Sequence, residues 1–135
     1  MNYLIDTDIV IYSLKNRASV IEKFQLYRAA PKALSVITYG ELIYGARKSK
    51  SVEKNLAVVH RLMEVFPIIN ISPAIMDTFG ELKASLKKSG MMLDDMDLLI
   101  ASTALTHNLV LVTNNERHFK RINGLAVENW AARLS

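Results

Sequence analysis

Four acidic or amide side chains lie far apart in this chain, and each follows an apolar run or stands in the first turn of a helical segment. They are Asp6, Glu41, Asp97 and Asn115. In α/β folds, residues that are distant in sequence can converge beyond the carboxyl ends of the strands. A small cluster of carboxylates is a site for a hard divalent cation, which prefers oxygen ligands. Metal-assisted hydrolysis of a phosphodiester is therefore the leading hypothesis.

The segments that position these side chains alternate between strand and helix patterns. Continuous apolar runs predict strands at 2–5, 33–37, 68–71, 109–113 and 126–128. Helical spacing of apolar residues predicts helices at 8–15, 18–29, 38–48, 51–65, 73–88, 95–106 and 116–120. Strands that are apolar throughout and alternate with helices are typical of a parallel sheet covered on both faces. No linker or repeat interrupts the pattern, so we expect a single domain over residues 1–135.

Helix capping offers a second explanation for the same acids. Three segments fit a capping box or a looser version of it: Thr38-x-x-Glu41, Asp94-x-x-Asp97 and Thr113-x-x-Glu116. Asp8 is a candidate N-cap for the helix at 8–15. Asp6 is harder to explain in this way, because an acid directly after a buried apolar run is costly unless it is paired, exposed at a cleft or bound to metal.

Composition narrows the class of protein. The chain has 135 residues, is 50% hydrophobic, and carries a net charge of +4 with a pI of about 9.4, which weakly favours a polyanionic partner such as RNA. The absence of cysteine excludes disulfides, thiolate zinc sites and a cysteine nucleophile, and is compatible with a cytoplasmic location. Neither a signal peptide nor an apolar run of roughly 20 residues is present, so we expect no membrane segment.

Four blocks of sequence, in order along the chain, carry a more specific pattern. They are Leu4–Tyr12, Ser35–Ala46, Asp97–Ala101 and Leu111–Phe119. Together they resemble the PIN-domain ribonucleases and, more narrowly, the VapC-type toxins of toxin–antitoxin pairs. The C-terminal segments Ile122–Leu125 and Glu128–Trp130 are also similar to that group, so the resemblance covers nearly the whole chain.

The resemblance implies a three-layer α/β/α fold with a central, mainly parallel sheet of four to five short strands. It also implies an endoribonuclease that depends on Mg²⁺ or Mn²⁺ and leaves a 3′-hydroxyl and a 5′-phosphate. Proteins of this group are usually homodimers and are inhibited by a tightly bound antitoxin protein. By position, Asp6, Glu41 and Asp97 form the acidic core, and Asn115 stands where the family often has a fourth Asp.

Several neighbours of the acidic core would support it. We expect Asp6 and Asp97 to contact the metal directly and Glu41 to act through bound water. Thr7 and Thr113 match small hydroxyl positions that orient a carboxylate or a water molecule. Asp8 is either a group behind the metal ligands or a helix cap, and the residues that could compensate for the missing Asp are Asp94, Asp95 and Glu116.

Basic side chains follow two of the site segments and could neutralise RNA phosphates. One group is Arg47 and Lys48; the other is Arg117, Lys120 and Arg121. The alternative for each is a solvated helix face. The three histidines, His60, His107 and His118, have no catalytic neighbour in the sequence, and we expect ordinary surface or helix-end roles for them.

Two other functions fit parts of the pattern. Leu4–Val10 also resembles the first motif of haloacid-dehalogenase-like phosphatases, in which Asp6 would be the nucleophile. Alternatively, the loss of the fourth Asp leaves a catalytically weak PIN-like module that only binds RNA or a protein. If the chain is a toxin, an antitoxin could silence it by laying an apolar helix on its surface and a cationic side chain in the acidic site.

Overall fold

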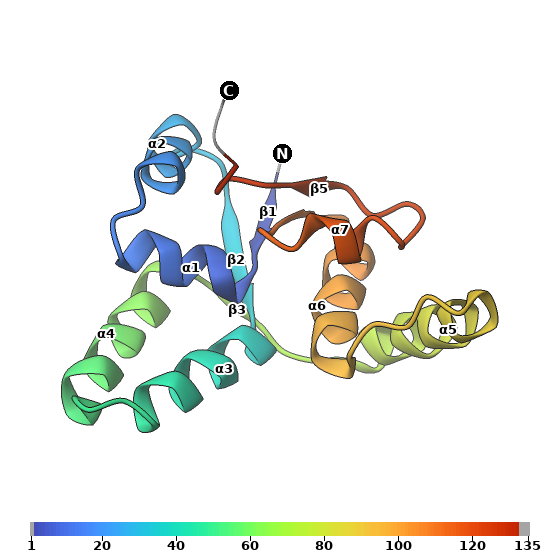
Figure 1. Cartoon of the computed structure of the whole chain (residues 1–135), viewed down its shortest axis with the longest axis horizontal. Coiled ribbons are helices and arrows are strands. Elements are labelled where there is room, and N and C mark those ends of the chain that lie inside the picture. The colour runs from blue at the N-terminus through green and yellow to red at the C-terminus, as the bar shows by residue number, and fades with distance from the viewer. Residues whose placement is uncertain (1, 133–135) are drawn as a thin grey trace.

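The computed structural model describes residues 2–132, and a five-stranded parallel sheet runs through them (Figure 1). The strands are β1 (Tyr3–Ile5), β2 (Lys32–Ser35), β3 (Ile68–Ile69), β4 (Val110–Val112) and β5 (Val127–Glu128). Their order in the sheet is β3-β2-β1-β4-β5, and each neighbouring pair is parallel. The chain builds outward from β1 in one direction and then returns to its other side at β4. Strand order therefore reverses between β1 and β4, which is where open α/β sheets form their sites.

Helices cover both faces of this sheet (Figure 1). The face that carries the side chains of Tyr3 and Ile5 is covered by α1 (Thr7–Leu14), α2 (Ala18–Leu26), α3 (Val36–Arg47) and α4 (Val52–Val65). The opposite face is covered by α5 (Pro73–Ser89), α6 (Asp95–Thr106) and α7 (Glu116–Phe119). The predicted three-layer α/β/α fold with a mainly parallel sheet of four to five strands is thus confirmed. None of the helices within residues 2–132 has the length and apolar character needed to span a bilayer.

The central strands are apolar at every position because both of their faces are buried. Tyr3 and Ile5 of β1 belong to one core cluster, and Leu4 between them belongs to the other. This alternation follows from the two-residue period of a strand. With both sides packed, β1 is held rigidly, and the residue that follows it is delivered to a defined point at the edge of the sheet.

Two of the helix starts that differ from the predicted ones concern the site. Helix α1 begins at Thr7 and its N-cap is Asp6, whose carboxylate accepts the Thr7 N–H at 2.8 Å. The expectation that Asp8 is the N-cap is therefore wrong. Helix α3 begins at Val36 rather than 38, because the Ser35 side chain caps it by accepting the Ile37 N–H at 3.0 Å.

The early start of α3 also decides the role of Glu41. In a capping box, Thr38 would be the N-cap and Glu41 the third helical residue. Thr38 instead lies inside the first turn of α3 and is fully buried. The capping-box explanation for Glu41 is wrong, and its carboxylate is exposed one turn further along the helix, free of any capping role.

Candidate active site

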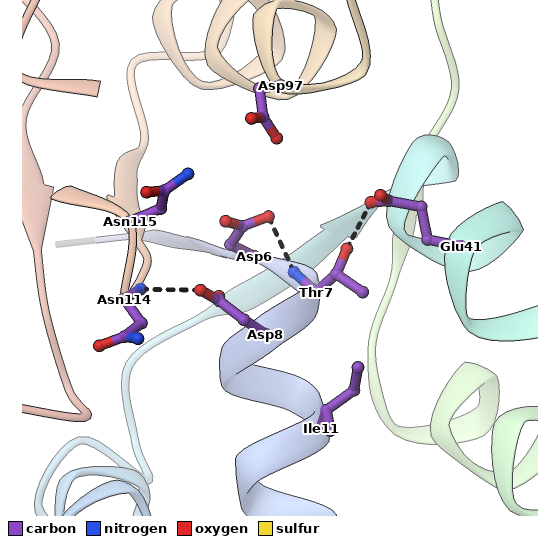
Figure 2. A pocket seen from close by; sticks show the side chains of 8 residues that line it. All are labelled: Asp6, Thr7, Asp8, Ile11, Glu41, Asp97, Asn114 and Asn115. Carbon is purple, nitrogen blue, oxygen red and sulfur yellow. Dashed lines mark hydrogen bonds between the residues drawn. The ribbon is translucent and has the colours of Figure 1, made fainter. Parts of the chain in front are cut away.

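A pocket of about 330 Å³ opens at the carboxyl ends of β1 and β4 (Figure 2). It is lined by Asp6, Thr7, Asp8, Ile11, Glu41, Asp97, Asn114 and Asn115. These residues come from the β1–α1 junction, from α3, from α6 and from the segment between β4 and α7. The structure thus brings the four side chains singled out in the sequence to one pocket, at the point where strand order reverses.

Asp6 lies at the floor of this pocket and is only 6% exposed. One carboxylate oxygen accepts the Thr7 N–H, and the other accepts the Thr113 hydroxyl at 2.7 Å. Burial is the largest effect on its pKa, and the charge of Asp8 adds to it; together they raise the pKa of Asp6 to about 7 despite the two hydrogen bonds. The ionised Asp6 carboxylate is therefore held in place but under-compensated.

Asp97 reaches the pocket from the first turn of α6. Burial is the largest cause, and the charges of Asp94 and Glu41 add to it; together they raise the pKa of Asp97 to about 6, although His118 opposes the rise. Asp94 is the N-cap of α6 and accepts the Asp97 N–H at 3.1 Å, so its predicted capping role is confirmed. Asp94 does not line the pocket, and it acts on Asp97 through its charge.

Asp8 is the carboxylate whose location was least expected. It projects from the first turn of α1 into the pocket, where one oxygen accepts the Asn114 N–H at 3.2 Å (Figure 2). Burial raises the pKa of Asp8, and the hydrogen bond from Asn114 opposes this rise. Asp8 therefore adds a fourth carboxylate to the wall of the pocket, beside Asp6, Glu41 and Asp97.

Threonine hydroxyls orient two of these carboxylates, in agreement with the predicted roles of Thr7 and Thr113. Thr7 donates its hydroxyl to Glu41 at 2.6 Å, and the hydroxyl of the buried Thr38 lies 3.0 Å from that of Thr7. Thr113 donates to Asp6 while its oxygen accepts the Asn115 N–H at 3.0 Å. Each hydroxyl has one proton, so these contacts leave little rotational freedom to the groups involved.

Asn115 lines the pocket with a neutral amide, whereas Asp6, Asp8, Glu41 and Asp97 line it with carboxylates. Its Nδ2 lies 2.8 Å from Nδ1 of His118, three residues further along. His118, for which we expected an ordinary surface or helix-end role, thus contacts a residue that lines the pocket, and its charge acts on Asp97. Sequence reasoning also missed Asn114 and Ile11. The separation of three residues from Asn115 was a signal for His118, because such residues share one face of a helix.

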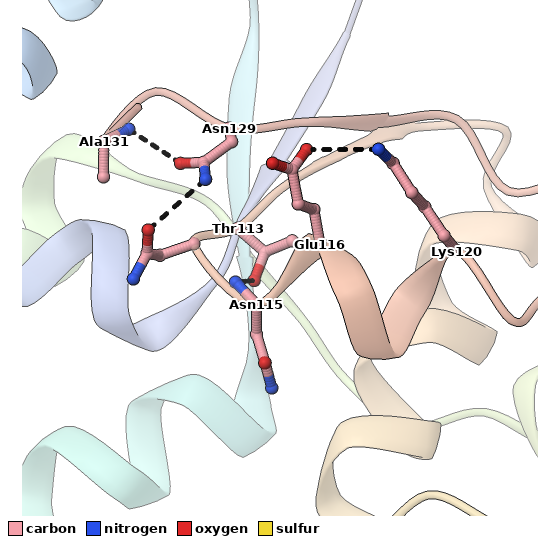
Figure 3. A network of polar contacts seen from close by, with 7 residues as sticks. Thr113, Asn115, Glu116, Lys120, Asn129 and Ala131 are labelled. Atoms are coloured by element: carbon pink, nitrogen blue, oxygen red, sulfur yellow. Dashed lines mark hydrogen bonds and ion pairs between the residues drawn. The ribbon is translucent and has the colours of Figure 1, made fainter. Parts of the chain in front are cut away.

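None of the three acids expected to compensate for the missing fourth Asp lines the pocket: Asp94 caps α6, and the other two turn away from the site. Glu116 turns away and pairs with Lys120 at 3.7 Å (Figure 3). Asp95 pairs with Lys83 at 2.9 Å on the outer side of α6. These expectations are therefore wrong. For Asp95 the reason is that a helix directs successive side chains about 100° apart, so that only one acid of the Asp95–Asp97 pair can face inward; Glu116 is held away from the site by its pairing with Lys120.

The basic side chains near the site are engaged to different degrees. Lys120 is paired with Glu116, and Arg121 donates to the backbone oxygen of Met92 at 3.1 Å. Lys48 lies over the ring of Tyr44, at 5.0 Å from its centroid. Arg47 and Arg117 are exposed on α3 and α7 respectively. No cationic side chain is hydrogen-bonded or ion-paired to the carboxylates that line the pocket, within residues 2–132.

The donor set fits a hard divalent cation. Carboxylate and amide oxygens are its preferred ligands. Burial, and after it the neighbouring negative charges, raise the pKa of Asp6 and Asp97, and a bound cation would offset both effects. Within the described part of the chain, no three acidic or histidine side chains already form a closed coordination group.

Comparisons with known proteins give a consistent result. The PIN domain family model matches residues 3–125. Ribonuclease VapC2 of Haemophilus influenzae is 38% identical over 131 residues, covering 96% of this chain and 98% of the relative. The tRNA(fMet)-specific endonuclease VapC of Shigella flexneri is 36% identical over 132 residues, covering 97% and 99%.

Solved structures agree as well. One is the crystal structure of VapBC2 from Rickettsia felis bound to a promoter DNA fragment. A chain of that structure matches with a TM-score of 0.90 and 37% identity, covering 96% of this chain and 99% of that one. DNA-bound VapBC from Salmonella typhimurium has a TM-score of 0.89 and 35% identity, with 96% and 98% covered. The match decides against the phosphatase that the segment Leu4–Val10 also suggested.

Proposed function

This chain belongs to the PIN-domain family of VapC ribonucleases, and we propose that its acidic pocket is the site at which it cuts RNA. The protein is an endoribonuclease, the toxin of a toxin–antitoxin pair. The observation that carries the assignment of the site is the convergence of Asp6, Glu41 and Asp97 on one pocket at the edge of the sheet. Three other pockets formed by residues 2–132 have no carboxylate in their walls.

PIN-domain ribonucleases depend on a divalent cation, and we propose Mg²⁺ for this chain, with Mn²⁺ able to replace it. Asp6 and Asp97 would hold the ion directly, and Glu41 through a water molecule. A bound divalent cation activates water for attack and offsets the charge that builds on the phosphate oxygens. The resulting ends would be a 3′-hydroxyl and a 5′-phosphate.

The remaining pocket residues orient these groups. Thr113 holds the Asp6 carboxylate and Thr7 holds that of Glu41, so that neither has to reorganise when substrate arrives. Asn115 occupies the fourth position as a neutral amide. It lowers the negative charge that a polyanionic substrate meets at the rim, and its N–H groups can donate to a phosphate oxygen.

RNA approaches this acidic pocket across basic side chains. We propose that exposed Arg117, and more weakly Arg47 and Lys48, neutralise backbone phosphates. Lys120 and Arg121 contribute less, because one is ion-paired and the other is bound to a backbone oxygen. The name of the Shigella relative makes the initiator tRNA the first substrate to assay.

The partner is an antitoxin protein, as in the VapBC structures that this chain resembles. The pocket holds four carboxylates without a cationic side chain of its own among the described residues, so an antitoxin arginine inserted there would take the place of the metal's charge. We further propose that the toxin acts in the cytoplasm and is a homodimer.

The experiment compares two acids in the same helical turn. Purified wild-type protein, Asp97→Asn and Asp95→Asn are incubated with tRNA in the presence of Mg²⁺, of Mn²⁺ or of EDTA, and the RNA ends are sequenced. We expect cleavage by the wild type and by Asp95→Asn only with metal, and a loss of at least about 100-fold for Asp97→Asn. Equal cleavage by all three proteins would refute the site, and no cleavage by any would favour a catalytically weak RNA- or protein-binding module.

A further inference from the structure

The segment between β4 and α7 is tied to two other parts of the chain through one residue, Asn114. Its backbone N–H donates to the Asp8 carboxylate at 3.2 Å. Its side-chain Nδ2 donates to the Tyr12 hydroxyl at 3.3 Å. Its side-chain Oδ1 accepts from Nδ2 of Asn129 at 3.3 Å. Asn114 is exposed and lies outside any helix or strand, so these contacts, rather than packing, hold its backbone.

Asn129 is fixed from the side opposite the pocket. Its Oδ1 accepts the Ala131 N–H at 2.9 Å (Figure 3). Its Nδ2 is thereby left to face Asn114. The carbonyl of Ala131 in turn accepts from the side chains of Arg17 and Ser19, each at 3.3 Å. Both ends of the Asn129 amide are therefore occupied, and its orientation is defined by the hydrogen bonds it makes.

The next residue anchors this segment in the core. Trp130 is 1% exposed and packs against the rings of Tyr3 and Phe24, with centroids 5.1 Å away in each case. It also stacks on Tyr27 at 5.5 Å. These aromatic contacts and its burial anchor Trp130 in the core. Asn129, which precedes this anchored residue, can therefore hold Asn114 in place, although Asn114 itself is exposed.

We propose that Asn129 is a positioning residue for the active site: it holds Asn114 and, through the Asn114 N–H, the Asp8 carboxylate at the wall of the pocket. Asn129 does not line the pocket and touches no reacting atom. The hydrogen bond from Asn129 to Asn114 also fixes the peptide that leads into Asn115. One side chain outside the pocket therefore positions both Asp8 and Asn115 inside it. The inference rests on the proposed function, since the pocket must be the place where metal and RNA bind.

The expected effect follows from the way in which outer hydrogen-bond partners act on metal sites. Loss of such a partner lowers metal affinity or activity by about 10- to 100-fold, because the ligands become less well oriented. Asn129 acts through Asn114, so we place its effect at the lower end, about tenfold in the dissociation constant for Mn²⁺. If Asn129 had only a structural role, its loss would lower the melting temperature of the protein. Metal affinity measured well below that temperature would then be unchanged.

The test uses three variants of the full chain. Asn129→Ala removes both contacts of the side chain. Asn129→Asp keeps the contact with the Ala131 N–H and can also keep the contact with Asn114. For this, the side-chain amide of Asn114 turns over, so that its Nδ2 donates to the new carboxylate and its Oδ1 accepts from the Tyr12 hydroxyl. Ser19→Ala loosens the anchor at Ala131 without touching Asn114. For each protein, Mn²⁺ affinity is measured by calorimetry. The backbone N–H of Asn114 is followed by ¹H–¹⁵N NMR in the absence of metal.

We expect Asn129→Ala to bind Mn²⁺ about tenfold more weakly. The NMR signal of the Asn114 backbone N–H should shift, and its hydrogen should exchange faster with solvent. Asn129→Asp and Ser19→Ala should bind Mn²⁺ like the wild type. The inference is overturned if Asn129→Ala retains wild-type affinity and an unmoved Asn114 amide, or if either of the other variants is impaired equally. A wild type that neither binds Mn²⁺ nor cuts RNA contradicts the proposed function instead, and the metal-free NMR result still decides whether Asn129 positions Asn114.

Discussion

Replacing Asp6 by asparagine should stabilise the metal-free protein at neutral pH while abolishing cleavage of RNA. The pKa of Asp6 is raised from 3.8 to about 7, mainly by burial and then by the charge of Asp8. A folded-state pKa above the unfolded value means that ionisation disfavours the folded state. The destabilisation is absent below pH 3.8, grows as the pH rises, and is complete above about pH 7.

The magnitude follows from the same two pKa values. A difference of about three pKa units, at about 1.4 kcal/mol each, corresponds to about 4 kcal/mol at pH 8. Asparagine removes this cost and can still accept the Thr7 N–H as N-cap. It no longer accepts the Thr113 hydroxyl, which costs about 1–2 kcal/mol. The net stabilisation of Asp6→Asn should therefore be about 2–3 kcal/mol at pH 8 and close to zero at pH 5.

Urea unfolding of the wild type and of Asp6→Asn, in EDTA at pH 5 and pH 8, measures this difference. The gap between the two free energies of unfolding should widen by about 2.5 kcal/mol from pH 5 to pH 8. Adding Mg²⁺ should stabilise the wild type and reduce the gap, because the cation binds only the folded state. A gap that is the same at both pH values would refute the claim that a strained, buried carboxylate lies at the centre of this site.

Three further predictions follow from single contacts. Thr113→Val leaves the Asp6 carboxylate without its hydroxyl donor and should lower kcat/KM for RNA by about tenfold or more, measured at saturating Mg²⁺. Arg117→Ala should weaken RNA binding and reduce the slope of log affinity against log salt by about one, whereas Lys120→Ala, which loses an already paired charge, should change the slope less. Trp130→Ala should lower the free energy of unfolding by about 3–5 kcal/mol in urea titrations, because the indole is fully buried; a loss below about 1 kcal/mol would contradict the anchoring role of this residue.

The fold was largely predictable because its signals are local. Continuous apolar runs at β1 and β4 indicated strands buried on both faces, and helical spacing indicated the covering helices. The side chains that line the pocket were recognisable for a related reason. Asp6 directly follows a buried strand, where an acid without a function is costly. The sequence of residues 111–119 and the other blocks then pointed to a family.

Errors arose where two local signals competed. Asp6 and Asp8 could each cap the first helix, and Ser35 and Thr38 could each cap the third. Capping depends on a φ/ψ change at one residue, which the surrounding strands determine through their length and pairing. Glu116 and Asp95 were likewise acids of the right type at the right distance along the chain, and each turned outward to a lysine.

By itself, the sequence determined which residue types were available, the order of strands and helices, and the parallel sheet. The sequence also indicated that Asp6, Glu41, Asp97 and Asn115 would converge. Only the tertiary structure decided that Asp8 and Asn114 share their pocket, since that depends on how β1 and β4 pair. The bond from Thr113 to Asp6 joins residues 107 positions apart, and the contact from Asn129 to Asn114 requires β5 to lie beside β4. Periodicity describes neighbours within a few residues, whereas these contacts are created by strand order and by the burial of Trp130 in the core.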